Sequence, residues 1–420
     1  MTINTKEKLP LQEIDRAIHS IIGRQSFLIG DVVNLILTNG VRYQSSDIHF
    51  EPSKEGMRIR YRVDGVFQAL TLLPKTLHEQ LVSRVKVMAG LISHKRDISQ
   101  EGRLTFQVDD DIFDFRVSII PTIAGEKTVV RIFYPSERMF DLHNLSYREE
   151  IESHYRMLLK DLRGMIVLTG PSGSGKTTTL YSSLLAIHRE QDDFASIVTI
   201  EDPVEYEFGL FGQMQVNRHA GMDFLHGLSA LMRQDPEVIM IGEIRDAETS
   251  AVALRAALTG HLVLTTIHSG NAAEVVTRLL NMAIEPFIIS SALTCVLAQR
   301  LVRLNCENCL EEYQPANNLL EFTHRFLDRK DFEFKRGAGC AECNYTGFLR
   351  RVPLAELLVL DDQMRNMILQ KVSTNDLRGY AIEKLEMKSL LSDGMDRVAE
   401  GSSTIEEILR VVGMHEGGLI

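Results

Sequence analysis

The residues with the clearest chemical purpose form one glycine-rich segment, GPSGSGKT at 170–177. Its pattern, G-x-x-x-x-G-K-[ST], gathers flexible backbone N–H groups, one lysine and one hydroxyl, which together suit a nucleotide phosphate chain. Such a loop needs a buried strand before it and a helix after it, because a helix N-terminus favours negative charge. The apolar run MIVL (165–168) and the helical pattern TTLYSSLLAI meet both needs. A chance glycine-rich turn is therefore a poor alternative.

Each residue type in this loop has an expected task. Lys176 is expected to reach the β- and γ-phosphates of ATP, and the hydroxyl of Thr177 is expected to bind Mg²⁺. The backbone of the other positions wraps the phosphates. The predicted nucleotide-binding residues are Gly170, Pro171, Ser172, Gly173, Ser174, Gly175, Lys176, Thr177 and Thr178.

Three further apolar runs end in polar residues that fit the same chemistry. In an open parallel sheet, ligands bind at the carboxyl ends of the strands. We therefore expect these acids and one histidine to meet the phosphate loop at one edge of a sheet. For a single acid at a strand end, the alternative is a helix cap or a solvated turn. The runs are 196–200, 238–241 and 262–267, and they are followed by Glu201-Asp202, Gly242-Glu243 and His268.

Two pairs of cysteines have the spacing of metal ligands. Cys306 and Cys309 form one CxxC pair, and Cys340 and Cys343 form another. Together they supply four thiolates, which predicts a closed structural Zn²⁺ site. Four unrelated cysteines are the alternative. The fifth cysteine, Cys295, lies in the apolar stretch ALTCVLAQ and is expected to be a core residue.

Length and charge limit the class of protein. The chain has 420 residues, a net charge of −11 and no tryptophan, and its length predicts two or three domains. The acidic balance argues against a broad nucleic-acid surface, because such surfaces neutralise phosphates with lysine and arginine. No apolar run approaches the roughly 20 residues of a membrane span, and the N-terminus lacks the apolar core of a signal peptide. We therefore expect a cytoplasmic protein that reaches a membrane only through partners.

Hydrophobic periodicity divides the chain. Apolar and polar residues alternate in MRIRYRV (57–63), which predicts a half-buried strand in an N-terminal mixed α/β domain. Farther on, apolar runs alternate with helical segments, the pattern of a parallel sheet with crossovers. The predicted class is α/β, with an N-terminal domain at 1–140, a linker at 141–154, a core at 155–300, a cysteine module at 301–352 and a helical region at 353–420.

Several motifs together resemble the secretion ATPase superfamily of type II secretion and type IV pili. They are SSDIHFEP, GPSGSGKTTTLY, IEDPVEYEF, RQDPEVIMIGEIRDAETS and TGHLVLTTIH, and the resemblance extends over nearly the whole chain. It implies a RecA-like P-loop ATPase core, a PAS-like domain before it and a ring of six copies. The cysteine module resembles that of assembly and secretion motors.

The resemblance also implies roles for individual residues. Glu205 becomes the general base for the attacking water, and Glu243 organises the Mg²⁺ shell. His268 is the nucleotide sensor, whereas His261, at the other end of its strand, is structural. Arginines supply positive charge to the γ-phosphate, with a surface salt bridge as the alternative for each. The matching arginines are Arg103 and Arg116 in the N-terminal domain and Arg233 and Arg245 in the core.

The implied function is ATP hydrolysis that powers type IV pilus assembly or type II secretion at the inner membrane. The implied partners are identical copies in a homohexamer and an inner-membrane platform protein. Whether a cytoplasmic recruiting protein also binds is left open. The alternatives are a pilus-retraction motor, a nucleic-acid translocase and a nucleotide-switched scaffold without hydrolysis. The cysteine module counts against a retraction motor, and the lack of tryptophan counts against a translocase that stacks bases.

The sequence departs from the family pattern at two places. Ser229 stands where many relatives carry a further arginine. Fewer than fifty residues precede the SSDIHFEP motif. The N-terminal docking domain of many relatives is therefore expected to be absent or reduced to a helix at 11–22.

Overall fold

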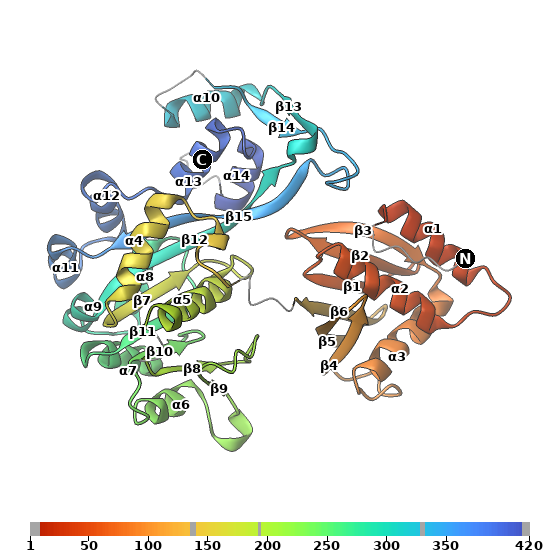
Figure 1. Ribbon diagram of the computed structural model, residues 1–420, viewed down its shortest axis with the longest axis horizontal. Coiled ribbons are helices and arrows are strands. Elements are labelled where there is room, and N and C mark those ends of the chain that lie inside the picture. The colour runs from red at the N-terminus through yellow and green to blue at the C-terminus, as the bar shows by residue number, and fades with distance from the viewer. Residues whose placement is uncertain (1–8, 135–139, 192–194, 328–331, 414–420) are drawn as a thin grey trace. The chain divides into compact units, whose positions relative to one another are not determined.

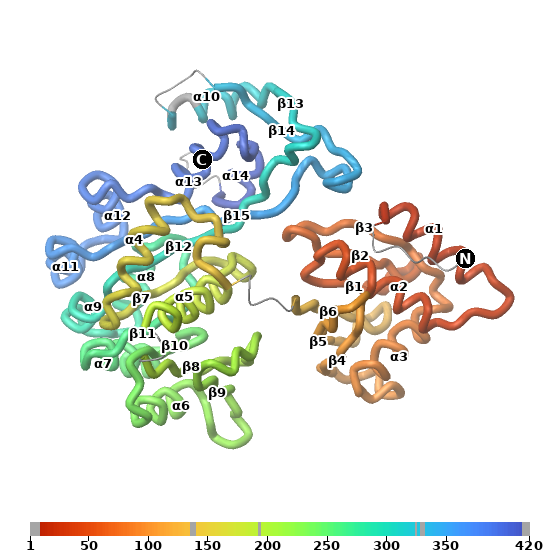
Figure 2. The backbone as a smooth tube through the Cα atoms, viewed as in Figure 1, coloured from red at the N-terminus to blue at the C-terminus, as the bar shows by residue number. Residues whose placement is uncertain are grey.

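The computed structural model describes residues 9–134, 140–191, 195–327 and 332–413. The chain forms two compact units, residues 1–136 with 339–349 and residues 137–338 with 350–420. Each unit is built around its own sheet (Figures 1 and 2). Among the described residues, none of the helices combines the length and the apolar character that crossing a bilayer requires.

The first unit is a six-stranded antiparallel sheet with three helices on one face (Figure 1). The predicted alternation holds in β2, where Ile59 and Tyr61 are fully buried while Arg58 is exposed on the opposite side. The buried sides of the strands and helices share one core. The opposite face carries charged side chains such as Arg60 and Glu51, which form an ion pair. The sheet order is β3-β2-β1-β6-β5-β4, and the elements are α1 (Leu11–Ile22), α2 (Ile29–Arg42), β1 (Asp47–Pro52), β2 (Met57–Val63), β3 (Val66–Leu73), α3 (His78–Met88), β4 (Gln100–Val108), β5 (Asp111–Thr122) and β6 (Gly125–Phe133).

The second unit contains a seven-stranded sheet of order β15-β12-β7-β11-β10-β8-β9. Six neighbouring strands, from β12 to β9, run parallel. The four predicted core strands are all present and adjacent, so the predicted parallel sheet is confirmed. The strands are β7 (Gly164–Thr169), β8 (Ile197–Glu201), β9 (Gly212–Gln215), β10 (Val238–Ile241), β11 (Leu262–Ile267), β12 (Leu293–Asn305) and β15 (Phe348–Val359).

Helices cover both faces of this parallel sheet. One apolar cluster joins α4 and α5 to one face, and a larger cluster joins the remaining core helices and the C-terminal helices to the other. The predicted helical region at 353–420 contributes helices to this packing, but its first residues, 353–359, belong to strand β15. The helices are α4 (Glu149–Lys160), α5 (Lys176–Glu190), α6 (Phe224–Leu231), α7 (Ala247–Leu258), α8 (Ala272–Asn281), α9 (Pro286–Ala292), α11 (Asp362–Leu369), α12 (Thr374–Lys384), α13 (Leu390–Ala399) and α14 (Ile405–Val412).

The cysteine segment lies between two adjacent strands of the core sheet. Residue 300 is inside β12 and residue 352 is inside β15, and these two strands are neighbours. Between them the chain forms α10 (Asn317–Phe326) and a small antiparallel pair, β13 (Leu310–Glu312) and β14 (Lys335–Gly337).

A buried carboxylate fastens α14 to β12. The side chain of Glu407 is 1% exposed and lies between Arg303 of β12 and Arg410 of α14. Arg303 Nη2 donates to Glu407 Oε2 at 2.7 Å, and Arg410 Nη2 donates to Oε1 at 2.7 Å. Burial alone would raise the pKa of Glu407, but the hydrogen bonds from both arginines outweigh it and hold this pKa at about 2. The ionised carboxylate therefore stabilises the folded state.

This depressed pKa predicts a pH-dependent contribution to stability. The contribution is complete above the unfolded pKa of 4.5 and is lost as the pH falls towards about 2. We expect Glu407→Gln to lower the free energy of unfolding by roughly 2–3 kcal/mol at neutral pH. One pH unit below the unfolded pKa of 4.5, this loss should be smaller by roughly 1 kcal/mol. Urea unfolding at both pH values measures it. The exposed neighbour Glu406, changed to Gln, is the control, and an equal cost for Glu407→Gln at both pH values would contradict the assignment.

Candidate nucleotide site

The phosphate loop connects β7 to α5 and is shaped by three glycines. Gly170, Gly173 and Gly175 have φ angles of 148°, 76° and 89°, which disfavour residues with a side chain. A Cβ atom at Gly170 would also lie 2.5 Å from the carbonyl oxygen of Gln299. The helix begins at Lys176, directly after the last glycine. The predicted order of strand, loop and helix is therefore confirmed, and the glycines serve both the turn and the close approach to β12.

The side chain of Lys176, which is predicted to bind the phosphates, lies against the phosphate loop. Its Nζ donates to the carbonyl oxygens of Gly170 at 2.8 Å and Pro171 at 2.9 Å. Burial and, to a smaller extent, the positive charge of Arg300 lower the pKa of Lys176 to about 8, and the carboxylate of Glu243 opposes this fall. Both present acceptors are uncharged, so a phosphate oxygen offers this ammonium a stronger partner.

Glu243 and His268 lie beside the same loop. His268 follows β11, and its Nδ1 lies 3.2 Å from the carbonyl oxygen of Gly170. Its Nε2 lies 3.8 Å from Oε2 of Glu243, which also forms an ion pair with Arg245. The structure thus brings a predicted acid, a predicted sensor and the phosphate loop into one cluster. Thr177, whose hydroxyl is predicted to bind Mg²⁺, is exposed at the start of α5.

The acidic segment after β8 is held by a tyrosine of α5. Glu201, the last residue of β8, is buried and accepts hydrogen bonds from the hydroxyls of Tyr181 and Thr199. Burial raises the pKa of Glu201, and the nearby carboxylate of Glu205 raises it further. The Tyr181 hydroxyl also accepts a hydrogen bond of 3.3 Å from the backbone N–H of Glu205. The predicted general base therefore lies on a loop that is anchored to the helix of the phosphate loop.

The two arginines predicted for the N-terminal domain belong to the first unit, whereas the phosphate loop belongs to the second. Arg103 lies opposite Arg116 in the β4–β5 pairing, and Arg116 lies opposite Arg131 in the β5–β6 pairing. Arg116 Nη2 donates to Glu101 at 2.9 Å. Their action on nucleotide stays a prediction.

The remaining predicted residues occupy separate places. His261 lies at the opposite end of β11 from His268, and its Nδ1 lies 2.9 Å from the carbonyl oxygen of Ala256 in α7. This contact suits the structural role predicted for His261. Ser229 lies within α6, and Arg233 follows the end of that helix.

The four paired cysteines converge. Their sulfur atoms all lie within 4.8 Å of one another, and the sulfurs of Cys340 and Cys343 are 3.8 Å apart. Four sulfurs at about 2.3 Å from a tetrahedral zinc ion are separated by about 3.8 Å. The backbone N–H of Cys340 donates to the sulfur of Cys343 at 3.1 Å. The arrangement fits a structural zinc ion. Cys295, in contrast, is fully buried in the core, and burial raises the pKa of its thiol.

Two polar residues of β12 that belong to the site were not predicted. Gln299 and Arg300 lie on β12, beside the phosphate loop. Arg300 Nη2 donates to the carbonyl oxygen of Gly270 at 2.6 Å, and Gln299 Nε2 donates to the carbonyl oxygen of Ser174 at 2.7 Å. The available indication was the polar pair QR directly after the apolar run ALTCVLA, which marks a fifth buried strand pointing at the same edge.

The parallel sheet, the phosphate loop and the cluster of Lys176, Glu243 and His268 define a P-loop nucleoside triphosphate hydrolase. The chain belongs to the Type II/IV secretion system protein family, whose model matches residues 24–410.

Named relatives and a solved structure agree with this family. The chain is 39% identical to type II secretion system ATPase E of Vibrio cholerae, over 90% of this chain and 74% of that protein. It is 38% identical to the type IV pilus assembly ATPase PilB of Myxococcus xanthus, over 90% of this chain and 67% of that protein. A crystal structure of the pilus retraction motor PilT with bound ADP shares the fold, with a TM-score of 0.60 and 24% identity over 90% of this chain and 96% of that chain.

The pKa of Lys176 predicts how nucleotide affinity changes with pH. Below about pH 8 the lysine is protonated before ADP arrives, so affinity is constant. Above about pH 8 a proton must be taken up on binding, because phosphate favours the charged form, and affinity should fall by up to about tenfold per pH unit. Calorimetric titration with ADP from neutral to alkaline pH measures this.

The matched control is Lys176→Arg. Its guanidinium keeps its charge over this range, so its affinity should be weaker but independent of pH. The same pH dependence in this variant and in the original protein would show that another group titrates.

Proposed function

We propose that this protein is a ring-forming ATPase that powers type IV pilus assembly or type II secretion from the cytoplasmic face of an inner membrane. The observation that carries the proposal is the cluster of phosphate loop, Glu243 and His268 at one edge of the parallel sheet. Family membership and relatives named as secretion and pilus-assembly ATPases supply the process.

The residues of the second unit divide the work of phosphoryl transfer. The loop N–H groups and Lys176 bind the phosphates, and Thr177 with Glu243 would hold Mg²⁺, which offsets charge on the transferred group. Glu205 would accept the proton of the attacking water, and Tyr181 fixes the backbone of the loop that carries it. His268, at the loop and at Glu243, would sense the γ-phosphate.

The first unit would complete the catalytic site. Arg103 and Arg116 would supply positive charge when nucleotide is bound, so that hydrolysis depends on the position of that unit. Six copies in a ring and an inner-membrane platform protein are the partners that this proposal requires. A cytoplasmic recruiting protein would bring the ring to the membrane.

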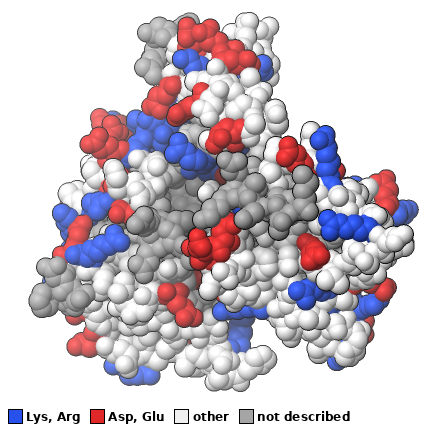
Figure 3. All heavy atoms as spheres, turned by 45° about the vertical axis from the view of Figure 1, so that its right-hand side comes forward, with Lys and Arg blue, Asp and Glu red and all other residues white. Residues whose placement is uncertain are grey.

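A nucleic-acid translocase on the same core is the second candidate, and surface charge counts against it. Acidic and basic side chains are interspersed on the face shown in Figure 3, and the whole chain carries a net charge of −11. Nucleic-acid channels instead gather lysine and arginine. Single-stranded DNA should therefore leave ATP turnover unchanged. The cysteine cluster argues in turn against a retraction motor, because the resemblance of the cysteine module is to assembly and secretion motors.

The proposed general base is tested by removing one charge. We expect Glu205→Gln and Glu243→Gln to lower ATP turnover by about a hundredfold or more while ADP still binds. Glu207→Gln is the matched control, because this exposed acid lies two residues farther along the same loop. Steady-state kinetics and a binding titration are the measurements. Turnover of Glu205→Gln equal to that of Glu207→Gln would exclude Glu205 as the base.

The cysteine cluster predicts about one zinc ion per chain. We expect Cys306→Ser to lose the metal while nucleotide still binds, because the phosphate loop contains none of the four cysteines. Cys295→Ala, at the buried fifth cysteine, should keep the zinc. Elemental analysis of protein purified without chelator measures the content. Absence of stoichiometric metal in the original protein would refute the prediction.

A further inference from the structure

The phosphate loop rests on the buried side chain of Gln299. This glutamine is 1% exposed and follows Ala298, which pairs with Thr169 at the end of β7. Its Nε2 donates to the carbonyl oxygen of Ser174 at 2.7 Å, and a Cβ atom at Gly175 would lie only 3.1 Å from that nitrogen. The loop and the amide are thus in direct contact.

This contact sets the direction of a neighbouring N–H group. In a planar trans peptide, the carbonyl and the N–H point in opposite directions. Because Gln299 holds the carbonyl of Ser174, the N–H of Gly175 must point away from Gln299. A loop that binds phosphate with its backbone depends on N–H directions of this kind.

The orientation of the Gln299 amide is itself set by the hydroxyls of Tyr147 and Thr179. The Tyr147 hydroxyl donates to Gln299 Oε1 at 2.8 Å, and Thr179 Oγ1 donates to the same oxygen at 3.2 Å. The two hydroxyls are also 2.9 Å apart. An amide presents its oxygen to donors and its nitrogen to acceptors, so two hydroxyl donors turn the nitrogen towards Ser174. Burial raises the pKa of Tyr147, so its hydroxyl keeps the proton that it donates.

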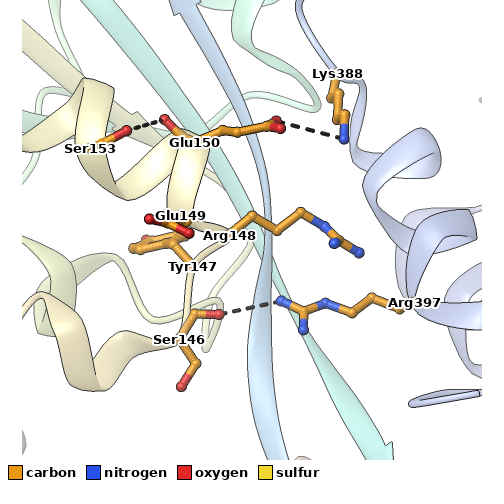
Figure 4. Close-up of a pocket in the computed structure, with 8 residues that line it drawn as sticks. All are labelled: Ser146, Tyr147, Arg148, Glu149, Glu150, Ser153, Lys388 and Arg397. Carbon is orange, nitrogen blue, oxygen red and sulfur yellow. Dashed lines mark hydrogen bonds and ion pairs between the residues drawn. The ribbon is translucent and has the colours of Figure 1, made fainter. Parts of the chain in front are cut away.

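Tyr147 is fixed by contacts on both sides of it in the chain. The carbonyl oxygen of Ser146 accepts a hydrogen bond of 3.3 Å from Arg397. Arg148 forms an ion pair of 2.5 Å with the buried Asp393 of α13. Figure 4 shows Tyr147 extending to the opposite side from Arg148, whose side chain extends towards α13 across a cavity of about 720 Å³. The position of the phenol is therefore set by α13 and not by the phosphate loop alone.

We propose that Tyr147 is a positioning residue for nucleotide binding, acting through Gln299 on the phosphate loop. The hydroxyl orients the amide, the amide holds the Ser174 carbonyl, and the loop N–H groups are directed before nucleotide arrives. Such preorganisation increases affinity because less ordering remains for the ligand to impose. The inference rests on the proposed nucleotide site.

A matched pair of tyrosines tests the proposal. Tyr155 is also buried, and its hydroxyl lies 2.9 Å from Ser183 Oγ, about one turn beyond Thr179 on the same helix. Tyr147→Phe and Tyr155→Phe each remove one buried hydroxyl next to α5, so both should lower thermal stability alike. We expect only Tyr147→Phe to weaken binding of a fluorescent ADP analogue, by roughly three- to tenfold. Tyr155→Phe should stay within about twofold of the original protein.

A double-mutant cycle shows whether Tyr147 acts through Gln299. In a Gln299→Met background, Tyr147→Phe should have no further effect on affinity. An effect as large as in the original background, or equal affinities for Tyr147→Phe and Tyr155→Phe, would overturn the proposal. If Gln299→Met does not fold, the comparison of affinity between Tyr147→Phe and Tyr155→Phe tests the proposal without the cycle. Failure of the original protein to bind the ADP analogue would instead refute the nucleotide site.

Discussion

The parallel register of the core strands decides which residues of the second unit can work together. β11 pairs with β7 up to Ile267 opposite Thr169, so the phosphate loop and His268 begin at the same level of the sheet. The neighbouring pairing of β10 with β11 brings Glu243 to that edge. Side-chain packing fixes this register, because a slip of one residue would turn every buried side chain to the opposite face of the sheet. The register of the sheet therefore determines which residues can form the site.

The first unit shows a different constraint, the cost of placing like charges together. The antiparallel register aligns Arg103, Arg116 and Arg131 on three adjacent strands. Like charges opposite each other are destabilising, and ion pairs from Glu101 to Arg116 and from Asp47 to Arg131 oppose the repulsion. This row of arginines suits the proposed task of delivering positive charge to a nucleotide.

The C-terminal region and the cysteine segment depend on the core sheet. β12 and β15 lie side by side in that sheet, and the segment with the four cysteines both leaves and returns there. α14 is attached to β12 through the buried carboxylate of Glu407, and α13 is attached to the start of α4 through Asp393 and Arg148. These ion pairs connect residues about one hundred or more positions apart. The C-terminal helices consequently hold the segment that contains Tyr147.

Much of this protein was determined by the sequence alone. The phosphate loop, the four core strands and the two CxxC pairs were predictable, because each depends on neighbouring residues or on a short period. The continuation of β12 beyond residue 300 and the roles of Gln299 and Tyr181 were not. Tyr147 and Gln299 are 152 residues apart in the sequence. They are in contact because β12 pairs with β7 and α4 packs against α5. Such contacts come from the pairing of distant strands and helices, which no local pattern of residues encodes, and only the tertiary structure decided them.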